Sequence, residues 1–251
     1  MPKPAYIRIA DELRQGIRDG TYPPGSRLPT LAALAGAHGV SDIVVRQAVA
    51  VLRAEGLVET RRGGGTVVRI RPPVRRMAME RYRVETGPRP APATSFTHDQ
   101  RIGWHEYRLD REYERVEADA ELAALFLLPP GTGLLRRRFV FWARGEPQQI
   151  SVNYLPWDLV GGTPVADPDR EPWPGGTPAQ LAYLGRPPTR VEEAVRARMP
   201  EPEEAETLRM AEGVPVITVT RRMFSGEHVL EVCRDIVIPA DRVVLDYSLD
   251  L

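Results

Sequence analysis

The order of apolar and polar positions in the first seventy residues predicts three helices and then a hairpin. In YIRIADELRQGI the apolar residues recur at spacings of three and four, which places them on one face of a helix. Thr30 is positioned to cap a second, short helix, LAALAGAH, and Ser41 to cap a third, whose inward face carries Val45, Val49 and Leu52. Two extended runs, LVET and GTVVRI, flank RRGGG, where glycines permit a hairpin with positive φ angles. The pattern therefore predicts a winged helix-turn-helix.

The C-terminal part of the chain contains both strand-like runs, with a period of two residues, and helical runs, with a spacing of three and four. Strand-like runs are HEYRLD, LLRRRFVFWA, QQISVNYLP, VPVITVTRRMF and HVLEVCRDIVIP, and helical ones are DAELAALFLL, PAQLAYLG and EPEEAETLRMAE. A unit of helix, strand, Gly-Glu turn and strand ending in proline occurs twice, around residues 131–156 and 213–239. We expect the two units to pair edge to edge in one antiparallel sheet, with helices on one face and a crevice for a small ligand. The whole chain is then α+β.

A stretch rich in proline and arginine, RPPVRRMAMERYRVETGPRPAPATSF, separates these two patterns. Proline stiffens a connection and opposes a core helix. We assign residues 1–70 to the winged helix-turn-helix domain, 71–94 to a linker and 95–251 to a second, C-terminal domain.

Charge is unevenly distributed along the 251 residues, although 34 basic residues balance 34 acidic ones overall. Residues 1–76 hold 13 Lys and Arg against 6 Asp and Glu, a net charge of +7, and the rest hold 21 against 28, a net charge of −7. A genome rich in arginine explains why Lys3 is the one lysine, but not why the cations gather in the first third. The asymmetry favours a module that binds a polyanion.

Cysteine usage and hydropathy indicate the compartment. Cys233 is the single cysteine, so no intramolecular disulfide is possible, and the apolar runs are shorter than a membrane span requires. We expect a cytoplasmic protein.

The sequence shows none of the common catalytic patterns. Its four histidines lack metal-ligand spacing, and there is neither a Gly-x-Ser-x-Gly elbow nor a phosphate-binding glycine loop before a helix. We expect no enzyme activity, no metal and no cofactor.

The N-terminal motifs resemble the DNA-binding domain of the GntR family of bacterial transcription regulators. The resemblance rests on YIRIADELRQGIRDGTYPPGSRLP, VSDIVVRQAVAVLRAEGLVE and RRGGGTVV, in that order and spacing. It implies binding of double-stranded DNA by the third helix and the wing, and a winged helix used only for protein contacts is the alternative. The DNA-binding residues implied are Thr30, Ser41, Asp42, Val44, Arg46, Gln47, Arg61, Arg62, Gly63 and Thr66.

Three positions depart from the family pattern. Asp42 and Val44 stand where the family usually has arginine and threonine, and Ala32 replaces an arginine of the second helix. An acid at Asp42 is favoured by the helix dipole and has Arg46 as an i,i+4 partner, or it accepts a hydrogen bond from cytosine N4. Both explanations predict an operator that differs from the usual half-site of the family.

The C-terminal motifs resemble the UTRA effector domain of the HutC branch of that family, which shares its fold with chorismate lyase. The resemblance rests on RGEPQQISVNYLP, EPEEAETLRMAEGVPV and TRRMFSGEHVLEVCRD. It implies a small-molecule effector, with Phe139, Phe141, Tyr154 and Glu231 as candidate contacts. The two phenylalanines, with neighbouring arginines on the opposite strand face, favour an apolar or aromatic effector other than a sugar phosphate. The alternatives are ordinary core aromatics and, for Glu231, the solvent face of a strand.

These inferences predict a homodimeric repressor that binds an inverted-repeat operator and responds to an effector. A constitutive repressor, for instance of mobile-element genes, with a C-terminal domain that only dimerises is the alternative, and a lyase-like enzyme is a further one by analogy of fold.

Overall fold

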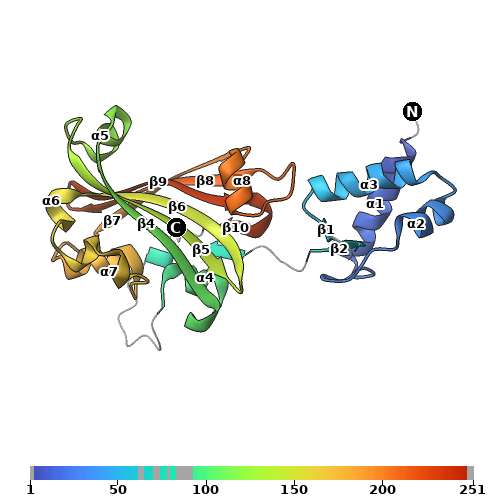
Figure 1. Cartoon of the computed structure of the whole chain (residues 1–251), viewed down its shortest axis with the longest axis horizontal. Coiled ribbons are helices and arrows are strands. Elements are labelled where there is room, and N and C mark those ends of the chain that lie inside the picture. Colours follow the sequence, from blue (N-terminus) through green and yellow to red (C-terminus); the bar gives the residue numbers. More distant parts are fainter. Residues whose placement is uncertain (1–2, 62–64, 70–73, 78–79, 83–92, 248–251) are drawn as a thin grey trace. The chain divides into compact units, whose positions relative to one another are not determined.

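A computed structural model describes residues 3–61, 65–69, 74–77, 80–82 and 93–247. Its contacts divide the chain into an N-terminal unit, which also includes residues 209–215, and a C-terminal unit. The helices are α1 (Ala5–Arg18), α2 (Leu31–His38), α3 (Asp42–Ala54), α4 (Ser95–Gln100), α5 (Ala120–Phe126), α6 (Trp157–Val160), α7 (Gly176–Tyr183) and α8 (Pro202–Thr207) (Figure 1). The strands are β1 (Val58–Arg61), β2 (Gly65–Val68), β3 (Val74–Met77), β4 (Tyr107–Glu117), β5 (Gly133–Ala143), β6 (Glu146–Pro156), β7 (Arg190–Arg198), β8 (Val216–Ser225), β9 (His228–Pro239) and β10 (Val243–Asp246). Short 3₁₀ segments are η1 (Glu80–Tyr82), η2 (Trp104–Glu106), η3 (Pro164–Ala166), η4 (Pro168–Arg170) and η5 (Ala240–Arg242).

The N-terminal unit is the predicted three-helix module with a two-stranded wing. Val45, Val49 and Leu52 of α3 are buried, which confirms the inward face that their spacing predicts. Gly39 ends α2 with a φ of 61°, a left-handed conformation that glycine adopts without strain, and so permits the sharp turn into α3. Arg14 of α1 also donates from Nε and Nη2 to Glu55 at the end of α3, at 2.8 and 2.6 Å.

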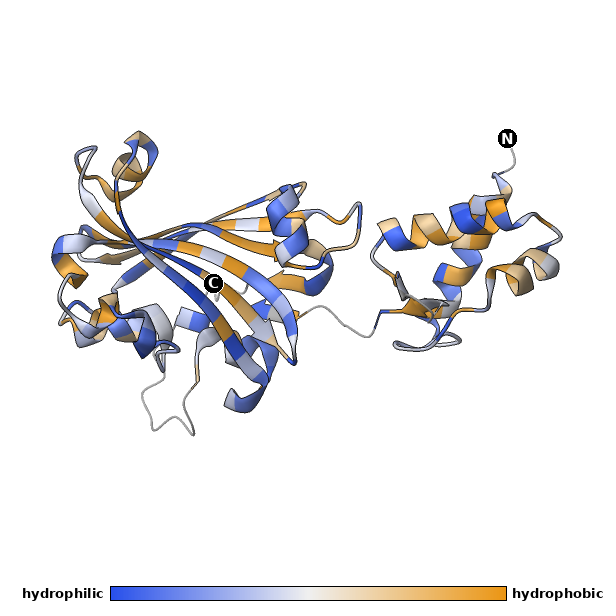
Figure 2. Cartoon of the chain, in the orientation of Figure 1, coloured by the Kyte–Doolittle hydropathy of each residue, from blue (hydrophilic) through white to orange (hydrophobic). Residues whose placement is uncertain are grey.

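The C-terminal unit contains a six-stranded antiparallel sheet with the strand order β4-β5-β6-β9-β8-β7. The predicted repeat is confirmed: α5, β5 and β6 form one unit, α8, β8 and β9 form the other, and β6 pairs with β9 where the two meet. Hydrophilic and hydrophobic bands alternate along the strands (Figure 2). Successive side chains of a strand point to opposite faces of the sheet, which explains this alternation.

Helices pack on both faces of this sheet, so the expectation of helices on one face is wrong. Leu134 belongs to a cluster with Phe126 of α5, whereas its neighbour Leu135 belongs to a cluster with Leu181 of α7. In Figure 1, α5 and α8 lie on one side of the sheet and α4 and α7 on the other. The physical reason is that β5 is apolar at both parities, so both of its faces need cover.

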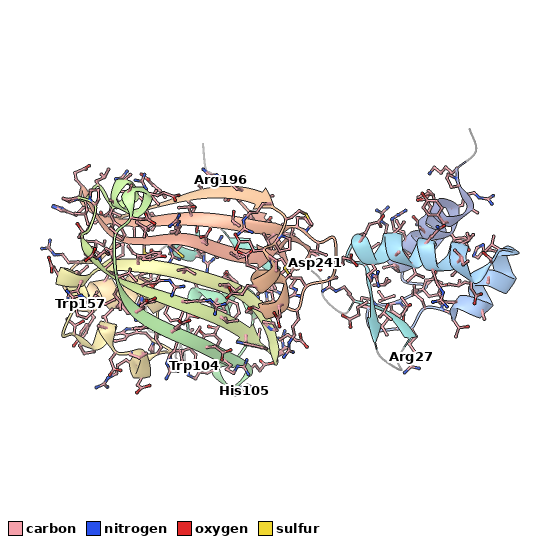
Figure 3. The ribbon with its side chains drawn as sticks, turned by 45° about the horizontal axis from the view of Figure 1, so that its top comes forward. Arg27, Trp104, His105, Trp157, Arg196 and Asp241 are labelled. Carbon is pink, nitrogen blue, oxygen red and sulfur yellow. The ribbon has the colours of Figure 1, made fainter. Side chains whose placement is uncertain are left out.

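Three strands of this unit have no counterpart among the predicted runs. The edge strand β7 pairs with β8 along its whole length, and it is largely exposed, as Arg196 illustrates (Figure 3). Strands β3 and β10 form a separate parallel pair. The segments β3 and η1 lie inside the range that composition assigns to a linker, and Arg76 of β3 is only 2% exposed.

No helix in the described ranges is long and apolar enough to cross a membrane.

Candidate nucleic-acid interface and ligand cavity

The first turns of α3 present a polar, exposed face. Ser41, Asp42, Arg46 and Gln47 are all exposed on it, and Val44 is half-buried. The adjacent inward positions hold the helix against the core, so the fold fixes which side chains point outward. This exposed end of a second helix in a helix-turn-helix is the part that reaches base edges in such modules.

The caps of α2 and α3 differ. Thr30 caps α2 as predicted, because its hydroxyl accepts a hydrogen bond from the Ala33 N–H at 3.2 Å. Ser41 occupies the N-cap position of α3, but its side chain makes no capping bond. The Thr30 hydroxyl is therefore used in capping α2, whereas the Ser41 hydroxyl makes no such bond and is exposed beside Asp42.

Asp42 lies in the first turn of α3, where the helix dipole favours an acid. The expected i,i+4 ion pair with Arg46 is absent from the ion pairs of the described residues, and neither side chain has another acidic or basic partner there. Both charges are therefore directed to solvent. The dipole remains as the structural reason for Asp42, and the base-reading explanation stays open.

The wing residues are described only in part. Thr66 of β2 pairs with Thr60 of β1, and its carbonyl accepts from the Leu28 N–H at 2.9 Å, so the segment before α2 lines the wing. Arg61 ends β1 opposite Gly65, but its side chain lies outside the described residues. Arg62 and Gly63 also lie outside them, so the predicted tip of the wing stays a prediction.

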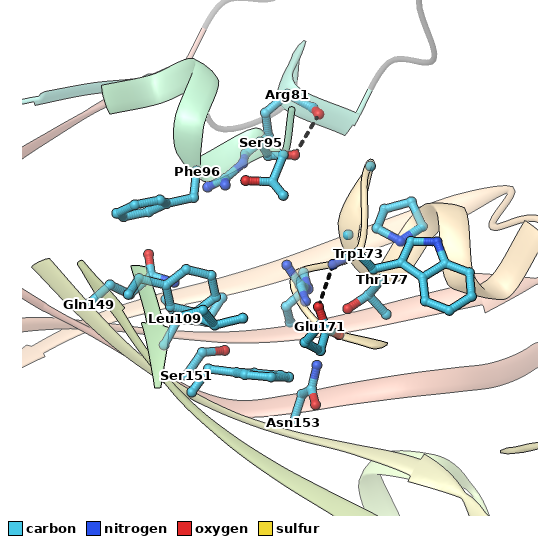
Figure 4. A pocket seen from close by; sticks show the side chains of 18 of the residues that line it. Arg81, Ser95, Phe96, Leu109, Gln149, Ser151, Asn153, Glu171, Trp173 and Thr177 are labelled. Atoms are coloured by element: carbon cyan, nitrogen blue, oxygen red, sulfur yellow. Dashed lines mark hydrogen bonds between the residues drawn. The ribbon is translucent and has the colours of Figure 1, made fainter. Parts of the chain in front are cut away.

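A cavity lies on the face of the large sheet that carries α4 and α7, and it contains about 720 Å³ of space including its open mouth. Figure 4 shows a floor of strand residues, among them Leu109, Ser151 and Asn153, below Phe96 of α4. Glu171, with Trp173 and Thr177 further along the same segment, forms one side of the cavity.

Aromatic rings line part of this cavity. Phe139 and Phe141 both line it, on alternate positions of β5 as predicted, with ring centroids 5.9 Å apart. The ring centroid of Phe96 lies 5.1 Å from that of Phe141 and 5.6 Å from that of Tyr107, which also lines the cavity. These rings form a wall suited to an apolar or aromatic molecule.

Tyr154 and Glu231 are not lining residues. Tyr154 points to the opposite face of the sheet and packs in the cluster around α5, while its neighbour Asn153 takes the cavity position. Glu231, predicted as an effector contact, is on the cavity face but 0% exposed, so the alternative that it lies on a solvent face is wrong. It accepts from Asn153 Nδ2 at 3.0 Å and from Arg221 Nη2 at 2.5 Å. Glu231 therefore positions two lining side chains from below.

A buried arginine, Arg137, organises the floor and was missed by the sequence reasoning. Its Nε donates to Asn153 Oδ1 at 2.9 Å, its Nη1 to Gln180 Oε1 at 2.8 Å and its Nη2 to Thr177 Oγ1 at 3.3 Å. Glu171 lies 3.8 Å away and accepts from Gln180. Every nitrogen of Arg137 thus has a partner in β6 or α7, which fixes the helix against the sheet.

A second polar cluster closes one end of the cavity. Arg221 reaches the Tyr82 hydroxyl at 3.4 Å, and that hydroxyl donates to Glu193 Oε1 at 2.5 Å. Arg76 Nη2 donates to the same oxygen of Glu193 at 2.7 Å. This cluster ties β3 and η1 to the sheet strands β7 and β8.

Ile43 of α3 is a further candidate that the sequence reasoning did not select. It is 68% exposed beside Asp42. Its exposure could be predicted from the sequence, because Val45 and Val49 define the inward face of the helix and residue 43 then lies on the outer face.

Family models match both units. The model for bacterial regulatory proteins of the gntR family matches residues 5–68, and the UTRA domain model matches residues 111–243.

Related proteins match over most of their length. An HTH-type transcriptional regulator of Streptomyces coelicolor is 31% identical over 222 residues, which cover 87% of this chain and 82% of that protein. The histidine utilization repressor of Pseudomonas putida is 28% identical over 243 residues, 96% of this chain and 90% of the relative. The HTH-type transcriptional repressor NagR of Bacillus subtilis is 25% identical over 89% of this chain and 85% of its own length.

Solved structures agree with the fold. A GntR-family transcriptional regulator superimposes with a TM-score of 0.62 at 35% identity, covering 99% of this chain and 98% of the other. PhnF from Mycobacterium smegmatis gives a TM-score of 0.55 at 21% identity, covering 98% and 99%. The latter likeness concerns the fold alone.

Proposed function

Since the chain belongs to the GntR family of bacterial transcription regulators, with a UTRA domain of the HutC type, we propose that it is a sequence-specific repressor controlled by a small effector. Membership makes it a transcription regulator and not an enzyme. The observation that carries the proposal is the combination of an exposed, charged α3 face with an open-mouthed cavity in a separate unit.

The proposed DNA contacts are those of α3 and the wing. Arg46 and Gln47 reach base edges in the major groove, and Arg61 and Arg62 hold phosphates or the adjacent minor groove. One recognition helix reads few bases, so we propose a homodimer on an inverted-repeat operator. Repression follows from occupancy of that operator.

The proposed effector site is the cavity, with Phe139 and Phe141 as contacts. The aromatic wall and the polar floor support a molecule with an apolar or aromatic body rather than a sugar phosphate. An effector that binds one arrangement of the dimer preferentially lowers operator affinity by shifting the population of arrangements.

A constitutive repressor is the second candidate. It keeps the DNA contacts but uses the C-terminal unit for dimerisation alone. The cavity, lined by aromatic rings and polar side chains, favours the effector-controlled interpretation, because a domain that only dimerises needs no such space. A metabolite screen by thermal shift separates the two readings, since a ligand of the folded state raises the melting temperature.

Selection of operators from random DNA tests the role of Asp42. We expect half-sites that differ from those of relatives with arginine at this position, and a cytosine preference that Asp42→Asn weakens at one base pair by about 1–3 kcal/mol. Ile43→Ala in the same selection should lose a thymine preference, because apolar side chains contact the thymine methyl. If Asp42→Asn leaves every base preference unchanged, Asp42 serves the helix dipole alone.

A variant that fills the cavity tests the effector. Ser151 is 5% exposed on the cavity floor, and Ser151→Phe places a ring in the space above it. We expect this variant to bind operator normally in a gel shift but to stop responding to any metabolite that releases the wild type. Arg138→Gln, on the opposite face of the sheet, should keep the response. A Ser151→Phe protein that still responds would place the effector elsewhere.

A further inference from the structure

The cavity end formed by β3 and η1 holds arginine donors without partners. Among the described residues, Nε and Nη1 of Arg76 and Nε of Arg81 are buried and make no hydrogen bond. Both residues line the cavity, and their side chains are 3% and 8% exposed. Glu193 Oε2, the second oxygen of the Arg76 partner, is also buried without a hydrogen bond. The three unpartnered arginine nitrogens outnumber this one oxygen, and buried donors are costly to leave unpaired, so this end of the cavity favours a further acceptor.

The electrostatics of this end also favour an added negative charge. Arg81 lies 3.2 Å from Asp99, yet burial raises the pKa of the Asp99 carboxyl, and burial together with the nearby cations Arg76 and Arg221 lowers the pKa of Arg81. The ion pair therefore does not offset the cost of burying its charges. An anion at the Arg81 Nε would stabilise the guanidinium.

Charge balance around the cavity limits how much negative charge it can accept. Each of four arginines has an acidic neighbour within 4 Å, and the pairs are Arg76–Glu193, Arg81–Asp99, Arg137–Glu171 and Arg221–Glu231. These pairs balance one another in formal charge, so an anion bound here adds uncompensated charge and is held by hydrogen bonds to the arginines; a dianion would add twice as much charge as a monoanion. A single carboxylate has two oxygens with about four lone pairs, enough to accept from one unpartnered nitrogen of Arg76 and from Nε of Arg81.

We propose that Arg76 and Arg81 bind the carboxylate of an aromatic or apolar monocarboxylate, whose body lies against Phe96, Phe139 and Phe141. This assignment rests on the proposed effector function of the cavity and names the chemical class of its ligand. It also supplies a route for regulation, because β3 directly follows the N-terminal unit in the chain. A ligand held by Arg76 fixes the segment to which the DNA-binding unit is attached.

The test measures binding to the full-length protein by calorimetry, without DNA. The probes are benzoate, phenylacetate and hydrocinnamate, the primary amide of each acid, and phenyl phosphate. We expect at least one acid to bind and its amide to bind about tenfold more weakly or not at all, because a hydrogen bond to a charged group is lost. Arg76→Lys and Arg81→Lys keep the ion pairs with Glu193 and Asp99 but remove the unpartnered guanidinium donors. Each variant should bind the acid more weakly than the wild type by a similar factor.

Arg222→Lys is the matched control, because Arg222 forms an ion pair with Glu192 at 2.5 Å and does not line the cavity. It should bind the acids like the wild type. Equal affinity for acid and amide, tighter binding of phenyl phosphate, no binding of any acid, or unaffected Arg76→Lys and Arg81→Lys proteins would each overturn the assignment.

A gel shift with the same probes separates this assignment from the proposed function. A neutral compound that fills the cavity and releases operator would refute the carboxylate assignment and leave effector control in place. A carboxylate that binds through Arg76 without any change in operator affinity would support the carboxylate assignment and refute effector control.

Discussion

Replacing Arg46 with alanine is expected to lower operator affinity by about 1–3 kcal/mol per half-site, roughly fivefold to 150-fold, through loss of a contact between its guanidinium and a base. The side chain is exposed in the second turn of α3 and has no acidic partner in the described part of the chain, so it is available to DNA. A dimer loses this contact in both half-sites. Gel shifts or fluorescence anisotropy over a range of salt concentrations would measure the loss.

The salt dependence separates a base contact from a phosphate contact. Loss of one phosphate contact lowers the slope of log affinity against log salt by about 1, whereas loss of a base contact relaxes sequence preference. Arg18→Ala is the control, since Arg18 is exposed at the end of α1 and not on α3. If Arg46→Ala binds operator as tightly as Arg18→Ala does, α3 is not the reading helix.

The N-terminal unit could be predicted nearly completely because its signals are local. Val45 and Val49 follow helical spacing, and Gly39 marks a turn that needs a positive φ. The paired strands of the C-terminal unit were also predictable, since each hairpin carries its own Gly-Glu turn. These features depend on residues that are close in the sequence.

What was missed depends on residues that are far apart in the sequence. Strand β7 alternates weakly, and the side chain of its Glu193 is buried against Arg76 and Tyr82, both more than a hundred positions earlier in the chain. The composition around Arg76 predicts an exposed linker. Tyr154 and Asn153 differ only in strand parity, and their assignment requires the register of β6 against β5.

Arg137 is an intermediate case, because the alternation that places Phe139 and Phe141 on the cavity face also places Arg137 there. A run of three arginines is ordinarily solvated, and only the partners on β6 and α7 show why the middle one is buried. One strand thus carries a fully buried arginine, Arg137, beside a half-buried one, Arg138.

Arg137→Met should therefore destabilise the C-terminal unit by about 3–5 kcal/mol, because it leaves Glu171 as a buried charge and removes the donor from Asn153 Oδ1 and Gln180 Oε1. Thermal unfolding of the full-length protein should show the transition of this unit lowered on the order of 10 °C. Arg138→Met is the matched control: it removes a part-exposed ion pair with Glu203 at 3.2 Å and should cost less than about 1 kcal/mol. Arg137→Lys should recover part of the loss by restoring the charge. Equal unfolding curves for the two methionine variants would show that the Arg137 network does not hold α7 to the sheet.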